Sequence, residues 1–388
     1  MTALSDVYIT RAAAFLPNDP VPNDRIEAVL GMAGGIPSRV KNMILRSNAI
    51  KTRYYAIDPA TRAATHSGTE LAAEAVRGLF AQGLNPADIG SLACGTSYPD
   101  QTMPGQGVML HGLLPEIPPC EVLTAAGVCV AGMAAMKQAY NAVRTGECRT
   151  AVAAASEAAS AMMRAESFRS ETDSRKLADA KPEIGFEKDF LRWMLSDGAG
   201  AVQLSCEPLA GSLNFKIRRI DILSYAGRMP VCMYAGGEVS ADGRFTGWKD
   251  IPERERAERS VMAVKQDVKL LNENIIAYTV EKPLRRLKDA YGLQAGQIDW
   301  FLPHYSSGFF RDKVAAGLSA AGLPIPQEKW FTNLPDKGNT GSASIYIILE
   351  EFMRRSDVRH GDTVLCYIPE SGRFSTCFML LEAVRTPS

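Results

Sequence analysis

Two different spacings of apolar residues alternate along the chain. Short apolar runs at 120–126 (CEVLTAA) and 149–156 (RTAVAAAS) are the length of buried strands. Between them, residues 130–146 carry apolar side chains at helical spacing and end at Gly146, which predicts a helix that stops at a glycine. This segment therefore predicts a strand–helix–strand unit.

The same alternation extends over most of the chain. Strand–helix–strand repetition is typical of a largely parallel, buried sheet with helices on its faces, so we expect an α/β fold. The other predicted helices are 71–84, 273–292, 311–323 and 340–355, and the other predicted strands are 88–97, 298–304, 362–368 and 374–384.

Two stretches interrupt this alternation. Residues 164–190 contain thirteen charged side chains, and residues 226–259 are rich in glycine, proline and charge. We expect both on the surface, either as loops that cover a functional site or as solvated loops without a role.

Length and charge narrow the class of protein. A chain of 388 residues can form two or three units with an ample core. Lysine plus arginine and aspartate plus glutamate both total 43, so net charge gives no reason to expect nucleic acid or an anionic membrane as partner. No apolar run reaches the roughly eighteen residues of a membrane span, and no secretory signal is recognisable, so we expect a cytoplasmic protein.

The eight cysteines are scattered and form no C-x-x-C pair, which predicts reduced and mostly buried thiols. The chain has only four histidines, none at ligand spacing from a cysteine, so we expect no metal site.

Cys129 lies where the predicted strand 120–126 gives way to the predicted helix from Val130, among alanine and glycine residues. Free backbone N–H groups at a helix start favour a thiolate, and small neighbours let a substrate reach the sulfur. The alternative is a buried cysteine at a close strand–helix contact.

Two further polar residues stand at the ends of predicted elements. His304 ends the strand 298–304, and strand ends are where open parallel sheets gather ligands. Asn339 precedes the helix 340–355. Each residue alone is explained as well by local hydrogen bonding, His304 at a strand end and Asn339 as a helix cap or turn residue. Together with Cys129 they form a candidate Cys–His–Asn set.

The segments around these residues resemble the ketoacyl-ACP synthase III branch of the thiolase-like condensing enzymes. The resemblance implies a thiolase-like five-layered αβαβα fold with two pseudo-repeated halves, here 1–207 (with the charged insert 164–190) and 208–388, in a homodimer. The similar segments are the nucleophile segment TAAGVCVAGMAAM (124–136), the histidine strand DWFLPH (299–304), the asparagine loop GNTGSAS (338–344), the aspartate–glycine strand LSDGAGAVQL (195–204) and the closing loop GDTVLCYIPESGRF (361–374).

The first sixty residues carry a narrower resemblance. Residues 8–31 and 36–58 are similar to the branch that builds dialkylresorcinols, in which a carbon–carbon condensation is followed by ring closure. This resemblance implies a role in secondary metabolism.

The resemblance also implies roles for individual residues. Cys129 would hold the acyl group of an acyl thioester, and the backbone N–H groups of Cys129 and Gly372 would bind the oxyanion. His304 and Asn339 would hydrogen-bond the carbonyl of a second, β-ketoacyl or malonyl thioester in a Claisen condensation. The phosphopantetheine of acyl carrier protein or coenzyme A would carry both substrates, without a metal or redox cofactor.

The chain departs from the family pattern at two of these segments. After His304 it has Tyr305 and Ser307 where the family has glutamine and asparagine in its acyl-handling segment, and we expect both in the substrate tunnel. The closing loop of the family reads Phe, three glycines and Phe, whereas here it is ESGRF (370–374), with Glu370 and Arg373 as intruding charged residues. An acid and a base here favour a polar substrate or an extra proton transfer; the alternative is a surface ion pair.

Two residues have less direct support. Glu157 ends the strand after the nucleophile helix and would serve as general base in ring closure, or belong to a hydrogen-bond network at the strand end. Met103 aligns with the family residue that caps the partner subunit's acyl tunnel, or is an ordinary core methionine.

Other classes explain parts of the pattern. A papain-like protease shares the order Cys–His–Asn but has a signature around its cysteine that is missing here. A thiolase needs a second reactive cysteine in a C-x-G loop, whereas Cys377 is followed by Phe and Met. A thiolase-like acyltransferase that moves the acyl group to an alcohol or amine without condensation is the main alternative. A non-catalytic partner subunit is the non-enzyme hypothesis.

Overall fold

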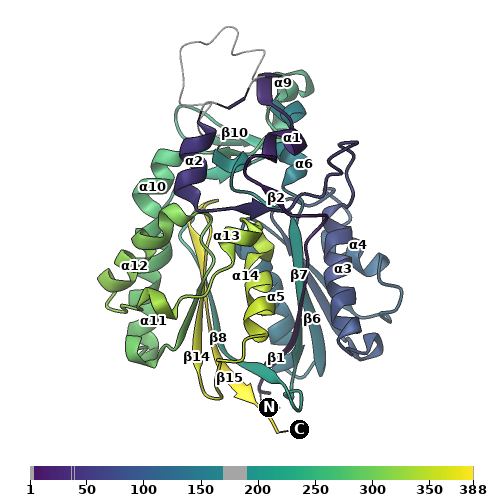
Figure 1. Ribbon diagram of the computed structural model, residues 1–388, viewed down its shortest axis with the longest axis vertical. Helices are drawn as coiled ribbons and strands as arrows, with labels where there is room; N and C mark the ends of the chain where they lie inside the picture. Colours follow the sequence, from purple (N-terminus) through teal and green to yellow (C-terminus); the bar gives the residue numbers. More distant parts are fainter. Residues whose placement is uncertain (1–3, 36, 39, 169–189, 388) are drawn as a thin grey trace.

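The computed structural model describes residues 4–35, 37–38, 40–168 and 190–387. Five layers stand side by side in Figure 1, with helices outside both halves of a sheet and two helices between them. The outer layers are α3 and α4 on one side and α10, α11 and α12 on the other; α5 and α14 form the central layer. This arrangement confirms the predicted αβαβα fold.

One nine-stranded sheet runs through the molecule in the order β13-β14-β15-β8-β1-β7-β6-β4-β5. Its strands are β1 (Tyr8–Phe15), β4 (Ser91–Thr96), β5 (Glu121–Ala126), β6 (Thr150–Glu157), β7 (Gly198–Ser205), β8 (Leu213–Ser224), β13 (Trp300–Pro303), β14 (Thr363–Pro369) and β15 (Ser375–Arg385).

The order of the strands shows the pseudo-repeat. In the first half β4 pairs parallel with β6, and β6–β7 and β7–β1 are antiparallel. In the second half β13 pairs parallel with β14, and β14–β15 and β15–β8 are antiparallel. The halves meet where β1 pairs with β8 over two residues. A domain boundary at 207/208, between β7 and β8, stays a prediction.

The prediction of a largely parallel sheet is wrong. Only β4–β5, β4–β6 and β13–β14 are parallel, whereas the five other pairs of this sheet are antiparallel. The strands that pair in parallel are joined through helices, as parallel pairing requires, whereas a short loop reverses the chain between β14 and β15. The strands β1 and β8, which periodicity did not reveal, complete the antiparallel centre.

All five predicted helices are present, one of them interrupted, but the shorter helices α1, α2, α4, α6, α9 and α13 were not predicted. The predicted helix 273–292 is α10, then a π-helical stretch (Ala277–Glu281), then α11. The helices of the described residues are α1 (Ile26–Leu30), α2 (Lys41–Asn48), α3 (Gly68–Ala81), α4 (Gln106–Gly112), α5 (Val130–Arg144), α6 (Ser160–Met163), α9 (Glu253–Glu258), α10 (Val268–Ile276), α11 (Lys282–Tyr291), α12 (Arg311–Ala320), α13 (Leu334–Lys337) and α14 (Ser344–Met353). None of the helices in these ranges has the length and apolar character to span a membrane.

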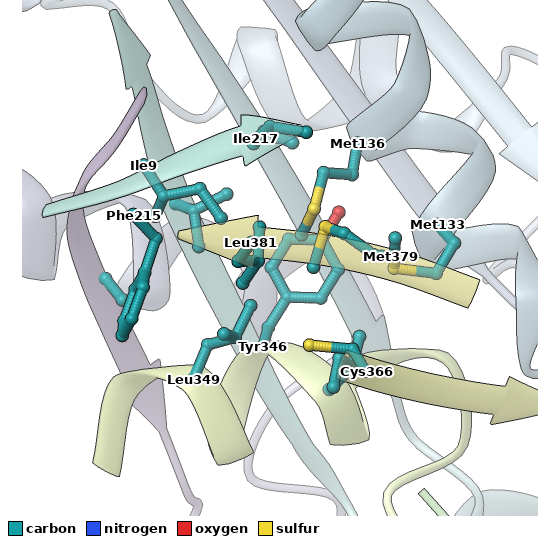
Figure 2. Close-up of a cluster of buried hydrophobic side chains, with 14 of the residues drawn as sticks. Ile9, Met133, Met136, Phe215, Ile217, Tyr346, Leu349, Cys366, Met379 and Leu381 are labelled. Atoms are coloured by element: carbon teal, nitrogen blue, oxygen red, sulfur yellow. The ribbon is translucent and has the colours of Figure 1, made fainter. Parts of the chain in front are cut away.

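The central layer packs closely enough to require small residues. The hydroxyl of Tyr346 on α14 donates to the carbonyl of Gly132 on α5 at 2.7 Å. A side-chain carbon at Gly132 would lie 2.2 Å from the carbonyl oxygen of Ser342, so only glycine fits. Figure 2 shows Tyr346 among apolar side chains of the sheet and α5. Part of the small-residue character around Cys129 therefore serves packing.

Residues 226–259, one of the two segments that break the alternation, lie at one end of the molecule, above the sheet in Figure 1. Residues 226–259 include the hairpin β10 (Gly237–Val239) and β11 (Phe245–Gly247), followed by α9. Of the charged segment 164–190, positions 169–189 lie outside the described residues.

Candidate active site

A cavity of about 540 Å³ lies at the end of the sheet beneath these segments. Cys129, Glu157, His304 and Asn339 all line it, although they come from four different parts of the sequence and from both halves of the fold. The structure thus brings together the four residues that sequence reasoning named as catalytic.

Cys129 lies on the turn between β5 and α5, directly before the first helical residue. Burial raises the pKa of its thiol, and the nearby carboxylates of Glu157 and Glu370 raise it further. The expected lowering of this pKa by the helix start is therefore wrong for the unliganded protein, because burial and negative charge outweigh the helix end. Cys129 rests as a protonated thiol.

His304 follows β13 and is held by its backbone N–H, which donates to the carbonyl of Tyr367 at 2.8 Å. Its side chain is buried, and burial lowers its pKa to about 4. The imidazole is therefore neutral at physiological pH. A neutral ring can donate a hydrogen bond from one nitrogen, but it does not form an ion pair with Cys129.

Asn339 is fixed by three short contacts. Its backbone N–H donates to the carbonyl of Met194 at 3.0 Å, and its carbonyl accepts from Ser196 at 2.8 Å. Its side-chain oxygen accepts from the N–H of Gly341 at 3.0 Å. The aspartate–glycine segment 195–204 thus holds the asparagine loop. Because Oδ1 of Asn339 already accepts from Gly341, the side-chain NH₂ group is left to donate to a substrate.

The carboxylate of Glu157 is part of a hydrogen-bond network. Its Oε1 accepts from the backbone N–H of Ser97 at 2.9 Å, and from the N–H and hydroxyl of Ser342 at 3.1 and 2.6 Å. Burial raises the pKa of Glu157, while these donors oppose the rise. The network expected as the alternative therefore exists, and it holds a carboxylate at the cavity wall.

Glu370 and Arg373 do not interact as the sequence suggested. Glu370 accepts hydrogen bonds from the backbone N–H groups of Val128 and Val130, on either side of Cys129, and burial raises its pKa. Arg373 is exposed, and its Nε donates to the carbonyl of Met229 at 2.7 Å. Within the described ranges no ion pair joins them, and the carboxylate of Glu370 contacts the nucleophile turn and Ser375 instead.

Gly372 lies against that same turn. A side-chain carbon at this position would come within 2.9 Å of Cγ2 of Val128. Its carbonyl accepts from the N–H groups of Cys232 and Met233 at 2.9 and 3.2 Å, which fixes the closing loop. This placement is compatible with the oxyanion role that the resemblance implies for its own N–H.

The three predicted tunnel residues have different positions. Tyr305 lines the cavity. Ser307 does not, since it is fully buried and its hydroxyl oxygen accepts from the N–H of Phe309 at 3.3 Å to start a short helical turn; its neighbour Ser306 lines the cavity instead. Met103 is 79% exposed and outside the cavity of its own chain, so the core alternative for it is wrong.

Sequence reasoning did not identify individual residues of the cavity roof. Met233, Tyr234 and Trp248 of the segment 226–259 line the cavity, which bears out the expectation that this segment covers a site. The available signal was the presence of large apolar residues within a polar segment.

The charged side chains in the described lining of the cavity are all acidic. Its described lining contains the carboxylates of Asp100 and Glu157 and no lysine or arginine. No group of three metal-ligating side chains occurs in the part of the chain that the structure describes.

Known proteins share both the sequence features and the fold. Residues 288–372 match the family model for the 3-oxoacyl-[acyl-carrier-protein (ACP)] synthase III C-terminal region. The beta-ketoacyl-[acyl-carrier-protein] synthase III of Sphingopyxis alaskensis is 28% identical over 289 residues, which is 74% of this chain and 75% of that protein.

Two solved structures extend the similarity to nearly the whole chain. The tetronic acid condensing enzyme AbyA1 superposes with a TM-score of 0.73 at 20% identity, over 97% of this chain and 99% of that one. A variant of Xanthomonas campestris OleA with bound lauric acid and lauroyl-CoA gives a TM-score of 0.73 at 18% identity, over 98% and 99%. At such identities these structures establish the fold. The matched family segment, the curated relative and the shared fold all support similarity of this chain to the 3-oxoacyl-[acyl-carrier-protein] synthase III enzymes.

Proposed function

We propose that the protein condenses an acyl thioester, held as acyl-Cys129, with a β-ketoacyl thioester and forms a carbon–carbon bond. The observation that carries this proposal is the single cavity in which Cys129, His304 and Asn339 meet. Phosphopantetheine of acyl carrier protein or coenzyme A would deliver both thioesters.

In the first step the sulfur of Cys129 attacks the thioester carbonyl, and the thiol proton leaves with the departing thiolate. The backbone N–H groups of Cys129 and Gly372 would stabilise the oxyanion that forms. One such donor typically contributes a factor of about 10²–10³ in rate. Because burial and the nearby carboxylates raise the pKa of Cys129, the nucleophile starts this step as the thiol.

In the second step the α-carbon of the other thioester becomes the nucleophile. The neutral imidazole of His304 and the NH₂ group of Asn339 would each donate to its thioester carbonyl as the enolate forms. The α-proton, acidified by the two flanking carbonyls, passes to water; the carbanion then attacks the acyl carbonyl, and the sulfur of Cys129 departs and takes up a proton to become the thiol again. Both groups act only as hydrogen-bond donors to the enolate oxygen, so neither changes its charge in this step.

The charge of the cavity favours a β-ketoacyl over a malonyl second substrate. A malonyl group brings a carboxylate, and the described lining offers it two carboxylates and no cation. A buried carboxylate without a positive partner is strongly disfavoured. A β-keto group is neutral, and it acidifies the carbon between the two carbonyls.

Ring closure would follow in a product of the dialkylresorcinol type, in secondary metabolism. It requires removal of one more proton from a carbon between two carbonyls. Glu157 is the base we propose, since it lines the cavity and burial raises its pKa. The resemblance of residues 8–31 and 36–58 to the dialkylresorcinol branch supports this product class.

A homodimer would complete the site. The strand β5 is the edge of the sheet, paired only with β4, so a second copy could extend the sheet there. Exposed apolar residues lie nearby on α4 and the loop before it; they are Met103, Val108, Met109 and Leu113. Met103 would then reach the partner subunit's cavity.

The deciding experiment is product analysis with matched thioesters. The protein is incubated with lauroyl-CoA and either a β-ketoacyl or a malonyl thioester, and products are identified by liquid chromatography with mass detection. A condensed product from the β-ketoacyl thioester supports the proposal. Acyl-Cys129 that transfers only to added alcohols or amines would establish the acyltransferase alternative, and no acyl mass on the intact protein would contradict both.

A further inference from the structure

Glu370 places a carboxylate between two loops that meet at the active site. In the closing loop its backbone N–H donates to the carbonyl of Ser375 at 2.9 Å, and the side chain of Ser375 hydrogen-bonds its carboxylate. A side-chain carbon at Gly372 of the same loop would lie 3.2 Å from Oε1, and one at Gly127 of the nucleophile turn would lie 4.0 Å from Oε2. The carboxylate therefore lies between the two loops, with a glycine on each side of it.

This carboxylate occupies two of three consecutive backbone N–H groups at the nucleophile turn. It accepts from Val128 and Val130, whereas the N–H between them, that of Cys129, is directed to its own sulfur. Backbone N–H groups at a helix start bind anions, and the helix end favours negative charge. Here a side chain of the protein itself supplies that negative charge. The N–H that it leaves to Cys129 is the one assigned above to the oxyanion.

The other charged groups around Cys129 do not offset this negative charge. Glu157 approaches from β6, and burial together with the charges of Glu157 and Glu370 raises the pKa of the thiol. His304 is neutral because burial lowers its pKa to about 4. Arg373 is exposed and donates to the carbonyl of Met229. The remaining titratable side chains of the described cavity lining are Tyr98, Asp100, Tyr234, Tyr305 and Tyr367.

We propose that Glu370 is a positioning residue that holds the closing loop against the nucleophile turn and occupies the anion-binding start of α5, so that this helix end does not activate the sulfur of Cys129. The same contact links the loops of Gly372 and Cys129, whose N–H groups are the two expected oxyanion donors, and so fixes the distance between them. A negative charge beside the turn disfavours the thiolate, which is the form that alkylating agents attack. Cys129 is thereby kept poorly reactive toward small electrophiles. The oxyanion part of this role rests on the proposed function, whereas the effect of the charge does not.

The rate of alkylation at Cys129 tests the effect of the charge. Wild type and Glu370→Gln are treated with iodoacetamide at several pH values, and the labelled peptides are quantified by mass spectrometry. Glutamine keeps an oxygen that can accept from Val128 and Val130 but removes the charge, so Cys129 should react about tenfold faster at a given pH. Cys206, half-buried directly after β7 and outside the cavity, is the internal reference. Arg373→Gln removes an exposed charge from the same loop and should leave the rate at Cys129 unchanged.

Acylation by lauroyl-CoA, followed by intact-protein mass spectrometry, tests the link between the loops. Glu370→Gln should be acylated at least as fast as the wild type. Glu370→Ala removes the acceptor as well as the charge, so it should be alkylated faster and yet acylated at least about tenfold more slowly, because the oxyanion donors lose their fixed spacing. Circular dichroism checks that the variants fold, and Glu370→Ala carries the alkylation test if Glu370→Gln does not fold.

Two results would overturn the role of Glu370. An unchanged alkylation rate of Cys129 relative to Cys206 in Glu370→Gln would contradict the effect of the charge. Unchanged acylation of Glu370→Ala would contradict the link between the loops. A wild type that gains no acyl mass would reject the proposed function instead, and the alkylation rates would still decide the effect of the charge.

Discussion

The floor and the roof of the cavity are built in different ways. Cys129, His304 and Asn339 form the floor of the cavity. Each lies directly after a strand or shortly before a helix of the repeated core. The roof comes from residues 226–266, inserted between strands β8 and β13. The floor lies on the strands and helices of the repeated core, whereas the roof lies on a segment outside them. We therefore expect changes in the floor to abolish chemistry and changes in the roof to alter the choice of substrate.

The largest effect is expected from Cys129→Ala. Without the sulfur no acyl-enzyme can form, so intact-protein mass spectrometry should show no acyl mass after incubation with lauroyl-CoA. Circular dichroism should be that of the wild type, because alanine fits the tight turn. Full turnover by this variant would remove the central claim.

The next effect separates the two steps of the reaction. His304→Ala and Asn339→Ala each remove one donor to the enolate, so condensation should fall by about 10²–10³-fold while acylation of Cys129 stays measurable. Ser307→Ala is the matched control, since Ser307 lies outside the cavity. Condensation at the wild-type rate in both variants would favour the acyltransferase.

A change at Glu157 should alter the product rather than the loading. Glu157→Gln keeps the size and hydrogen bonding of the side chain but cannot accept a proton, so uncyclised condensation products should accumulate. General base catalysis typically contributes at least about 10²-fold, which sets the expected fall in cyclic product. Liquid chromatography with mass detection checks this. Unchanged cyclic product would exclude Glu157 as the base, and no cyclic product from the wild type would reject ring closure.

The buried histidine of the floor predicts a pH dependence of stability. The folded pKa of His304 is about 4, below the ordinary 6.5, so its contribution is full above pH 6.5 and is lost as the pH falls toward 4. The difference corresponds to about 3 kcal/mol. Asp197, whose pKa burial raises to about 6, has the opposite dependence in part of this window.

Comparing two chains isolates the histidine. Urea unfolding of the wild type and His304→Gln between pH 4 and 7 should show a smaller loss of stability at low pH in the variant, because glutamine does not titrate. Equal slopes for the two proteins would show that His304 is not buried in its neutral form.

The smallest effect is expected in the roof. Trp248→Ala enlarges the cavity, so the preference among acyl chain lengths should shift by about tenfold in kcat/KM while acylation and condensation both continue. Arg254→Ala is the control, since its side chain is 90% exposed on α9 of the same segment. An unchanged chain-length profile in Trp248→Ala would show that the roof does not select the substrate.

The spacing of apolar residues predicted several strands and helices of the repeated core, but it did not predict how the strands pair in the sheet. The strands around 91–96 and 150–157 and the helix from Val130 follow from short apolar runs and helical spacing. The antiparallel strands β1 and β8 were not predicted, because their pairing depends on partners far along the chain. The π-helical stretch at Ala277–Glu281 lies inside an apolar pattern that is indistinguishable from a continuous helix.

The sequence by itself determined the alternation of strands and helices and the nucleophile turn, because these depend on local spacing, and the resemblance of its motifs implied the αβαβα class and the Cys–His–Asn set. Only the tertiary structure decided the protonation states of Cys129 and His304. Burial and the carboxylates of Glu157 and Glu370 raise the pKa of Cys129, and burial keeps His304 neutral. The burial of the side-chain oxygen of Gln266 without a partner among the described residues likewise arises from contacts between distant segments. Desolvation and long-range proximity are properties of the packed molecule, and no local pattern records them.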